Sequence, residues 1–235
     1  GLYDMEGLED VRHRELTTPF GAPSDAFVCG RIGPCEIYFL PRHGRGHRIL
    51  PAELNHKANI YAFKELGVTR IIAPAAVVSL KKRIGPGHFI VPDQFVHFTR
   101  RADTFYEERP VTHVSAAEPY CPELRAQLIE AGRQMQLALH ESGTSVIIEG
   151  PRFASGAESA FYRAQGWDTL DMTQYPEMML ARELEMCYAS ISLVTDYDYV
   201  EESNEKLRKL IFDVIPKIPE VRTCICSRAL EGSRL

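Results

Sequence analysis

Short apolar runs of strand length alternate along most of the chain with longer segments of helical periodicity. Several of these runs are rich in apolar and β-branched residues, as buried strands usually are. They are Ile71 to Ala75, Phe89 to Pro92, Thr144 to Glu149 and Tyr188 to Thr195. Two further runs, Ala26 to Arg31 and Cys35 to Leu40, flank the turn signal Gly33-Pro34 and predict a β-hairpin. The alternation predicts an α/β domain with a buried sheet.

The periodic segments predict helices whose ends carry recognisable signals. The first helix, Ala52 to Leu66, stops at Gly67. Ser155 and Glu158 have the spacing of a capping box, and Pro176 suits a first helical turn, where no N–H is needed. The other expected helices are Pro122 to His140, Gly156 to Gln165, Glu177 to Met186, and a last one that begins within Glu201 to Leu210.

Composition narrows the class of protein. The 235 residues contain no repeat, low-complexity segment or linker, so residues 1–235 are interpreted as one domain. The formal net charge is -5 and the basic residues are scattered, which argues against nucleic acid as a partner. No apolar run approaches the roughly 20 residues of a membrane span, and the first residues do not resemble a secretory leader. The six cysteines are widely spread, unlike the dense disulfide framework of a small secreted domain, so a cytoplasmic protein is predicted. No membrane partner is expected.

One segment that follows a predicted strand is rich in positive charge. Residues 41–48 read Pro-Arg-His-Gly-Arg-Gly-His-Arg, and ligands of α/β sheets bind in loops of this kind. The cations, led by Arg42 and His43, and the free backbone N–H groups predict a site for a phosphate-like anion. A solvated basic loop is one alternative. A zinc site at His43 and His47 is another, disfavoured because no third ligand is nearby.

Two other loops between a strand and a helix offer side chains to a ligand. In residues 148–153, Phe153 is placed to stack on a flat ligand, with a core position as an equal alternative. In residues 171–177, Thr173 can offer its hydroxyl and N–H to an anion at a helix N-terminus. Met172 beside it, taken alone, is more typical of a core residue.

Two pairs of residues near the C-terminal end also suggest chemistry. Asp196 and Asp198 follow an apolar run, and carboxylates two residues apart point the same way in extended backbone. Such a pair can share a proton, which raises one pKa and suits a general acid, whereas turn-forming aspartates are the alternative. Cys224 and Cys226 are predicted to be free thiols, with a strained local disulfide as the alternative.

Taken together, the motifs match a known family in order along most of the chain. The matching segments are Thr18 to Asp25, Arg42-His43-Gly44, Asn59, Pro92 to Phe95, Ala117 to Cys121, Glu149 to Phe153, Ala157 to Ser159, Met172-Thr173, Pro176-Glu177 and Thr195 to Asp198. The chain thereby resembles the 5'-methylthioadenosine phosphorylases, a branch of the trimeric purine nucleoside phosphorylases. The resemblance implies a central mixed twisted sheet flanked by helices. It also implies phosphorolysis of a purine nucleoside, in which phosphate attacks the anomeric carbon, with no metal and no organic cofactor.

The resemblance assigns binding roles to residues on three loops. Arg42, His43 and Thr173 would bind the phosphate, and an arginine suits this task because it stays charged at any working pH. Met172 would lie against the ribose, and Phe153 would stack on the base.

The resemblance also assigns the proton transfer and the base preference. Asp196 would protonate N7 of the leaving purine, and Asp198 would accept a hydrogen bond from its 6-amino group, which favours adenine over 6-oxopurines. His113 matches a position that reaches the 5'-substituent pocket of a neighbouring subunit, so a homotrimer is implied, with a hexamer as the larger alternative. A methylthioinosine or general purine nucleoside phosphorylase is the neighbouring interpretation.

The chain departs from the family pattern in three places. The family begins with a strand and a glycine-rich phosphate loop, of which only the last glycine matches Gly1, and it has a longer segment after Asp198. At Ala75 and Val78 the family carries a hydroxyl residue and a glycine. A β-branched residue tolerates positive φ poorly, so a reshaped loop is expected there, in which Ala76 still offers its N–H. These departures leave a nucleoside-binding protein with weak catalysis as an alternative.

Overall fold

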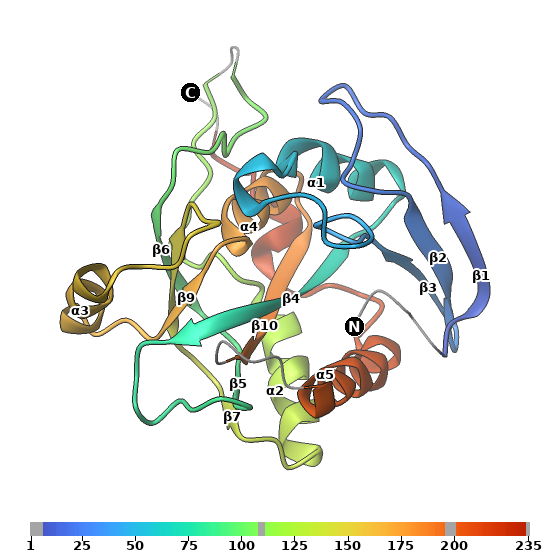
Figure 1. The fold of residues 1–235 in the computed structure, drawn as a ribbon. Helices are drawn as coiled ribbons and strands as arrows, with labels where there is room; N and C mark the ends of the chain where they lie inside the picture. The colour runs from blue at the N-terminus through green and yellow to red at the C-terminus, as the bar shows by residue number, and fades with distance from the viewer. Residues whose placement is uncertain (1–6, 108–110, 196–200, 234–235) are drawn as a thin grey trace.

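A seven-stranded mixed sheet forms the centre of the protein. The computed structural model describes residues 7–107, 111–195 and 201–233 (Figure 1). The strands follow the order β6-β8-β9-β4-β10-β5-β7. Their bounds are β4 Arg70–Ser79, β5 Phe89–Ile90, β6 Gln94–Phe98, β7 Leu139–His140, β8 Thr144–Ile148, β9 Thr169–Asp171 and β10 Cys187–Val194. The β4–β10 pair is parallel and the β4–β9 pair antiparallel, which confirms the expected mixed sheet.

The strand β4 connects the two halves of this sheet. It pairs with β10 from Arg70 to Val77 and with β9 at Val78 and Ser79. The sequence predicts that this strand ends at Ala75, followed by a reshaped loop, and that prediction is wrong. The strand is four residues longer, because β10 pairs with Ala76 and Val77 and β9 pairs with Val78 and Ser79, and Val78 does not adopt positive φ.

Helices cover both faces of the sheet. They are α1 His56–Glu65, α2 Pro122–Gln134, α3 Gly156–Ala164, α4 Gln174–Glu183 and α5 Glu201–Val214, with 3-10 turns η1 Pro51–Glu53, η2 Ile215–Lys217 and η3 Ile225–Arg228. The first predicted helix is split, because the Asn55 side chain accepts from the Ala58 N–H and starts α1 there. The second ends early, because Gln136 has a φ of 53°. The capping box of Ser155 and Glu158 is confirmed.

A second, three-stranded antiparallel sheet packs beside α1. It contains β1 Glu9–Arg14, β2 Phe27–Ile32 and β3 Cys35–Phe39, and the predicted hairpin is its β2–β3 pair. The first strand was not predicted, because all six of its residues are exposed and give no apolar pattern. Phe27 packs edge-on against Phe63 of α1, which fixes the position of the loop after β3.

The core lies on both sides of β10, whose eight residues are all buried. On one side Ile191 packs with Leu128 of α2 and Leu210 of α5. On the other side Tyr188 packs with Met178 of α4. The loops at the ends of β4, β8 and β9 are thereby held on a well-packed layer. In the part of the chain that the structure describes, no helix is long and apolar enough to cross a membrane.

Candidate active site

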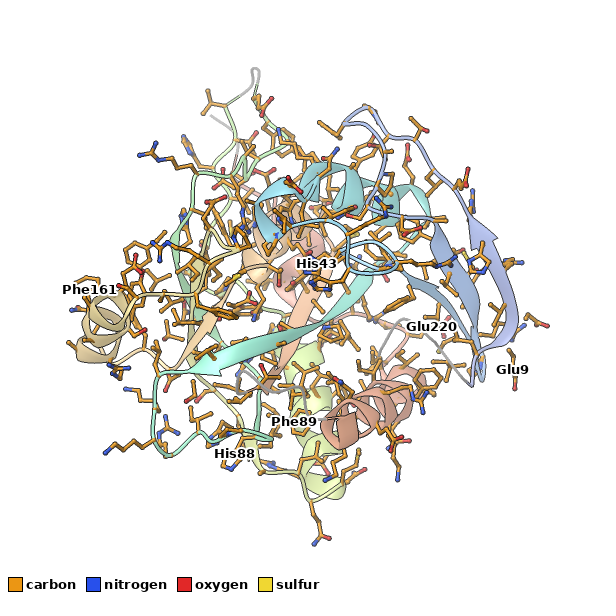
Figure 2. All side chains as sticks on the ribbon, in the orientation of Figure 1. Glu9, His43, His88, Phe89, Phe161 and Glu220 are labelled. Carbon is orange, nitrogen blue, oxygen red and sulfur yellow. The ribbon has the colours of Figure 1, made fainter. Side chains whose placement is uncertain are left out.

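A cavity of about 1230 Å³ extends along β4. Its wall combines the loop after β3, the middle of β4, the loop before α4, and the α5 residues Asn204, Arg208 and Phe212. Six residues that the sequence predicts for binding line this cavity. They are Arg42, His43, Ala76, Phe153, Met172 and Thr173. Figure 2 shows His43 near the middle of the molecule, far from Glu9 and Phe161 at its opposite edges.

Arg42 is held in place by a carboxylate and a carbonyl group. Its Nε and Nη2 donate to Glu177 Oε1 and Oε2 at 2.5 and 2.9 Å, and its Nη1 donates to the Pro74 carbonyl at 3.3 Å. A guanidinium has five N–H groups, so two have no partner among the described residues and are available to an anion. The side chain is 18% exposed. Arg42 is therefore a preorganised cation at the cavity wall.

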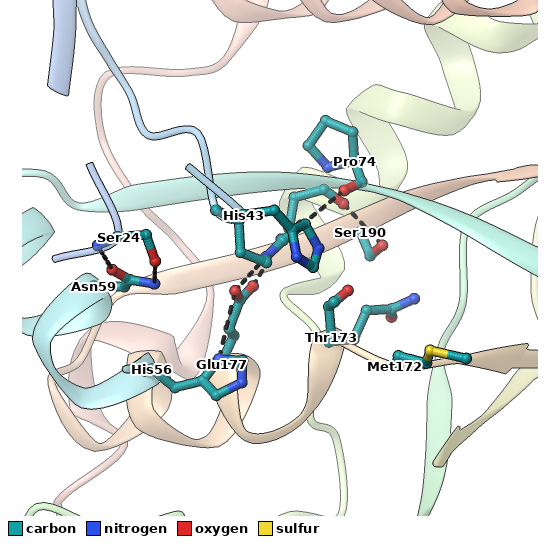
Figure 3. A network of polar contacts seen from close by, with 12 residues as sticks. Ser24, His43, His56, Asn59, Pro74, Met172, Thr173, Glu177 and Ser190 are labelled. Carbon is teal, nitrogen blue, oxygen red and sulfur yellow. Dashed lines mark hydrogen bonds and ion pairs between the residues drawn. The ribbon is translucent and has the colours of Figure 1, made fainter. Parts of the chain in front are cut away.

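Glu177 makes more polar contacts than the sequence suggested. Besides Arg42, the Tyr188 hydroxyl donates to Oε2 at 2.9 Å, and His56 Nδ1 lies 3.7 Å from Oε1. Burial raises the pKa of Glu177, but the charge of Arg42 and hydrogen bonds outweigh this effect and hold the pKa well below its usual range. Figure 3 shows Glu177 between His56 and the loop that carries His43. An ionised Glu177 fixes Arg42 in one orientation.

His43 has one ring nitrogen committed to the protein. Its Nδ1 lies 2.9 Å from the Ile49 carbonyl oxygen, which can only accept, so this nitrogen carries the proton. The ring stacks on His47 with centroids 4.4 Å apart. Burial lowers the pKa of His43, and the neighbouring Arg42 and His47 lower it further. Nε2 is thus the nitrogen that a ligand can engage. His43 and His47 are not part of any metal-type group among the described residues.

Thr173 lies at the start of α4, where a buried carboxylate organises the loop. Asp171 Oδ2 accepts from the N–H groups of Thr173 and Gln174 at 3.0 and 2.7 Å, and the Thr173 hydroxyl lies 3.3 Å from Oδ1. The predicted offer of the Thr173 N–H to an anion is therefore taken up by Asp171. The hydroxyl, at a longer distance, is the group that can turn toward a ligand.

Arg101 joins two loops of the site and was not found from the sequence. Its side chain is 7% exposed, and its Nη1 donates to the carbonyl groups of Met172 and Tyr175 at 2.6 and 3.0 Å. Its Nη2 donates to the carbonyl of Glu149 at 2.7 Å. Arg101 therefore fixes Met172 relative to the end of β8. No local pattern marks such a residue, because its partners are 48 to 74 residues away.

Phe153 and Met172 belong to the apolar part of the cavity wall. Phe153 is 52% exposed, so the alternative that it is a core residue is wrong. Met172 is half-buried and packs against the cluster that contains Leu170 and Tyr162. A thioether and an exposed ring in the wall of one cavity suit a flat or weakly polar ligand.

The remaining predicted residues are His113, Asp196 and Asp198. His113 is exposed and does not line the cavity, and its N–H donates to the Ser233 carbonyl at 2.7 Å. Asp196 and Asp198 lie outside the described residues. Thr195, which directly precedes them, lines the cavity and donates its N–H to the Val77 carbonyl at 3.0 Å. All six cysteines are free, so the Cys224–Cys226 disulfide is not formed.

Comparisons with known proteins agree with this architecture. A model of the phosphorylase superfamily matches residues 3–215. S-methyl-5'-thioadenosine phosphorylase of Nitrosopumilus maritimus is 47% identical, and the match covers 98% of this chain and 94% of that protein. Purine nucleoside phosphorylase of Streptomyces coelicolor is 41% identical, with 99% and 92% covered. A mutant of Schistosoma mansoni adenosine/methylthioadenosine phosphorylase, solved in complex with methylthioadenosine, superposes with a TM-score of 0.92 at 35% identity, covering 100% and 95%.

The match over residues 3–215 thus places the chain and its mixed sheet in the phosphorylase superfamily. Within that superfamily, the chain belongs to the methylthioadenosine phosphorylase family.

Proposed function

We propose that this protein cleaves the N-glycosidic bond of 5'-methylthioadenosine with phosphate, releasing adenine and 5-methylthioribose 1-phosphate. The observation that carries the proposal is one cavity whose wall combines an anchored Arg42, His43 and Thr173 with the apolar Phe153 and Met172. The first group suits an anion and the second suits a nucleoside. Relatives named for this reaction are aligned over nearly the whole chain.

Product release with and without phosphate tests the proposed reaction. Adenine released from 5'-methylthioadenosine only when phosphate is present supports it. Hypoxanthine released from methylthioinosine or inosine at a comparable rate would instead support the neighbouring specificity, which the name of the Streptomyces relative favours. Binding of all three nucleosides without release of any base would indicate a binding protein.

In the proposed mechanism, Arg42, His43 and the Thr173 hydroxyl hold the phosphate. His43 is neutral and donates through Nδ1 to the Ile49 carbonyl, so its Nε2 accepts a hydrogen bond from the O–H group of the hydrogen phosphate ion. A phosphate oxygen then forms the bond to the anomeric carbon as the bond from that carbon to N9 breaks. Thr173→Val should raise the KM for phosphate about tenfold, since one hydrogen bond to a charged ligand is lost. Thr17→Val, at an exposed threonine outside the cavity, is the matched control.

Asp196 and Asp198 are proposed to act on the base, as the family motif implies. The electron pair of the broken bond passes to the purine, which takes a proton at N7 from Asp196, so no metal or organic cofactor is needed. Asp196→Asn should lower kcat about 10²-fold with little change in binding. Asp198→Asn should shift the preference toward 6-oxopurines, because an amide can donate to the 6-oxygen. A variant that still strongly prefers adenine would exclude this role.

Met172 is proposed to lie against the ribose and Phe153 against the base, with the Ala76 N–H available to the sugar or phosphate. We also propose a homotrimer in the cytoplasm, in which the exposed His113 reaches the 5'-substituent pocket of a neighbouring subunit; a hexamer would consist of two such trimers. Light scattering coupled to size exclusion tests the assembly. In a trimer of this kind, His113→Ala should raise the KM for 5'-methylthioadenosine more than the KM for phosphate.

A further inference from the structure

Four of the six cysteines meet in the core, away from the cavity. Cys121 directly precedes α2, Cys187 begins β10, and Cys224 and Cys226 come from the segment around η3. All four side chains are buried, and their sulfur atoms all lie within 4.8 Å of one another. None of them lines the cavity of the proposed reaction. Three segments that are far apart in the sequence therefore converge on one point through thiols.

The spacing of these sulfur atoms fits joint coordination of one metal ion better than it fits disulfide bonds. Four sulfurs at about 2.3 Å from a tetrahedral zinc ion are about 3.8 Å from one another. Cys187 Sγ and Cys224 Sγ are 3.3 Å apart, well beyond the roughly 2.05 Å of a disulfide. Cys224 and Cys226 are separated by one residue, so they can supply two adjacent corners of a tetrahedron.

The surroundings of the four cysteines provide positive potential. Cys121 is the N-cap residue of α2, where the helix dipole favours negative charge. Arg222 Nη1 lies 4.0 Å from Cys187 Sγ, and the N–H groups of Leu124 and Cys226 face the sulfurs of Cys121 and Cys224. The Glu123 carboxylate is a negative group beside the cluster: it accepts from the Cys224 thiol, and also from the Thr223 N–H at 2.6 Å. Such N–H groups and cations are typical of the shell around metal-bound thiolates.

We propose that Cys121, Cys187, Cys224 and Cys226 bind one Zn²⁺ as a structural site. Four thiols lose their protons to solvent, and each thiolate donates an electron pair to the ion, so nothing is oxidised or reduced. Sulfur ligands select zinc among the common divalent ions, and four protein ligands leave no open position for chemistry. The ion ties the C-terminal segment to the start of α2 and the start of β10. This proposal does not depend on the proposed reaction.

Metal content and intact mass test the zinc site. The untagged full-length protein is expressed with added zinc, purified without chelators, and measured by plasma mass spectrometry and by native and denaturing mass spectrometry. We expect about one zinc ion per chain, lost on denaturation with all six cysteine thiols of the chain left free. Cys226→Ser should remove the bound zinc. Cys35→Ser, at a half-buried cysteine outside the cluster, should retain it.

Two results would overturn the proposal. A metal-free protein with all six thiols reduced would make the cluster a patch of buried core side chains. A denatured mass lower by four hydrogens would show two disulfides. Because Cys226→Ser can fail to fold, cobalt substitution of the unmutated protein provides a second test. Tetrahedral thiolate ligation predicts intense visible absorption and a sulfur-to-cobalt band in the near ultraviolet, and their absence would also contradict the site.

Discussion

Two arginine–glutamate pairs in this protein have nearly the same geometry and very different surroundings. Arg42 and Glu177 form a two-point contact at 2.5 and 2.9 Å, with side chains 18% and 6% exposed. Arg152 and Glu158 form one at 2.7 and 2.8 Å, with side chains 70% and 37% exposed. The first pair anchors the part of the cavity wall that is proposed to bind phosphate, and the second lies at the start of α3.

The comparison shows that a lowered pKa does not by itself measure the importance of an ion pair. The hydrogen bond from Arg152 lowers the pKa of Glu158 to about 2, although both groups are in water. Water screens that attraction, and it solvates each separated charge about as well as the ion pair does. Glu177 has no such alternative, because burial would raise its pKa if Arg42 were absent. Only in the buried pair does the loss of one partner leave the charge of the other uncompensated.

The largest effect is expected from Glu177→Gln. This change leaves the charge of Arg42 buried without a counterion, which typically costs about 3–5 kcal/mol of unfolding free energy. Urea denaturation measures the loss. The KM for phosphate should rise as well, because Arg42 is no longer held in one orientation. If the urea midpoint shifted as little as it does when the exposed Arg152–Glu158 pair is removed, the distinction between the two pairs would be contradicted.

Tyr188→Phe should have the next largest effect. The Tyr188 hydroxyl donates to the ionised Glu177 at 2.9 Å, and such bonds to charged groups contribute about 1.5–3 kcal/mol. Tyr120→Phe is a matched control, because this buried hydroxyl donates at 2.6 Å to the neutral amide of Gln174, where about 0.5–1.5 kcal/mol is expected. Equal losses in the two variants would mean that the charge of Glu177 adds nothing.

A pH dependence should follow from His56, the neighbour of Glu177. Burial lowers the pKa of His56; Glu177 raises it, whereas Arg101 and Arg42 lower it. The folded state therefore favours neutral His56. The stability that neutral His56 provides is therefore fully present above the unfolded pKa of about 6.5. Below that pH the unfolding free energy falls by up to about 1.4 kcal/mol per pH unit.

The difference in unfolding free energy between the unmutated protein and His56→Leu isolates this dependence from other titrating groups. We expect the unfolding free energy of the unmutated protein minus that of the variant to be constant above pH 7 and to decrease from pH 6.5 downward. The absence of hydrogen-bond partners for both ring nitrogens among the described residues supports tolerance of an apolar replacement. A difference that is flat from pH 8 to pH 5 would contradict the lowered pKa.

The smallest effect is expected from Arg152→Gln. This change removes the exposed pair but leaves the capping interaction of Glu158 with the Ser155 N–H at 2.6 Å. We expect no measurable shift of the urea midpoint and an unchanged KM for phosphate. A shift comparable to that of Glu177→Gln would show that solvent exposure is a poor guide to these pairs.

The buried elements of the fold could be predicted from the sequence, and the exposed or very short ones could not. β10 and β8 are continuous apolar runs and were predicted within one residue of their bounds. β1 has no buried residue, and β7 has only two residues, so neither gives a periodic signal. The helix before β7 was predicted too long, since a left-handed Gln136 carries no sequence signature.

Some residues of the candidate site could likewise be identified from the sequence, whereas the contacts between them could not. Arg42 and Thr173 follow strands or precede helices, so local patterns identify them as candidates. The contact of Arg42 with Glu177 joins residues 135 positions apart, and no local pattern predicts it. Likewise, the sequence directs attention to Cys224 and Cys226, but only the fold brings Cys121 and Cys187 to them.

The pairing of β4 with β10 also constrains how the chain reaches its fold. The Ser190 hydroxyl donates to the Ala73 carbonyl at 2.9 Å across 117 residues. During synthesis at about 5–20 residues per second, β4 therefore waits on the order of ten seconds before its parallel partner exists. Non-local parallel pairing is also intrinsically slow to form. The newly made first third of the chain thus carries an unpaired apolar strand edge for longer than most folding steps take, which makes that interval the period of greatest exposure to aggregation and to chaperone binding.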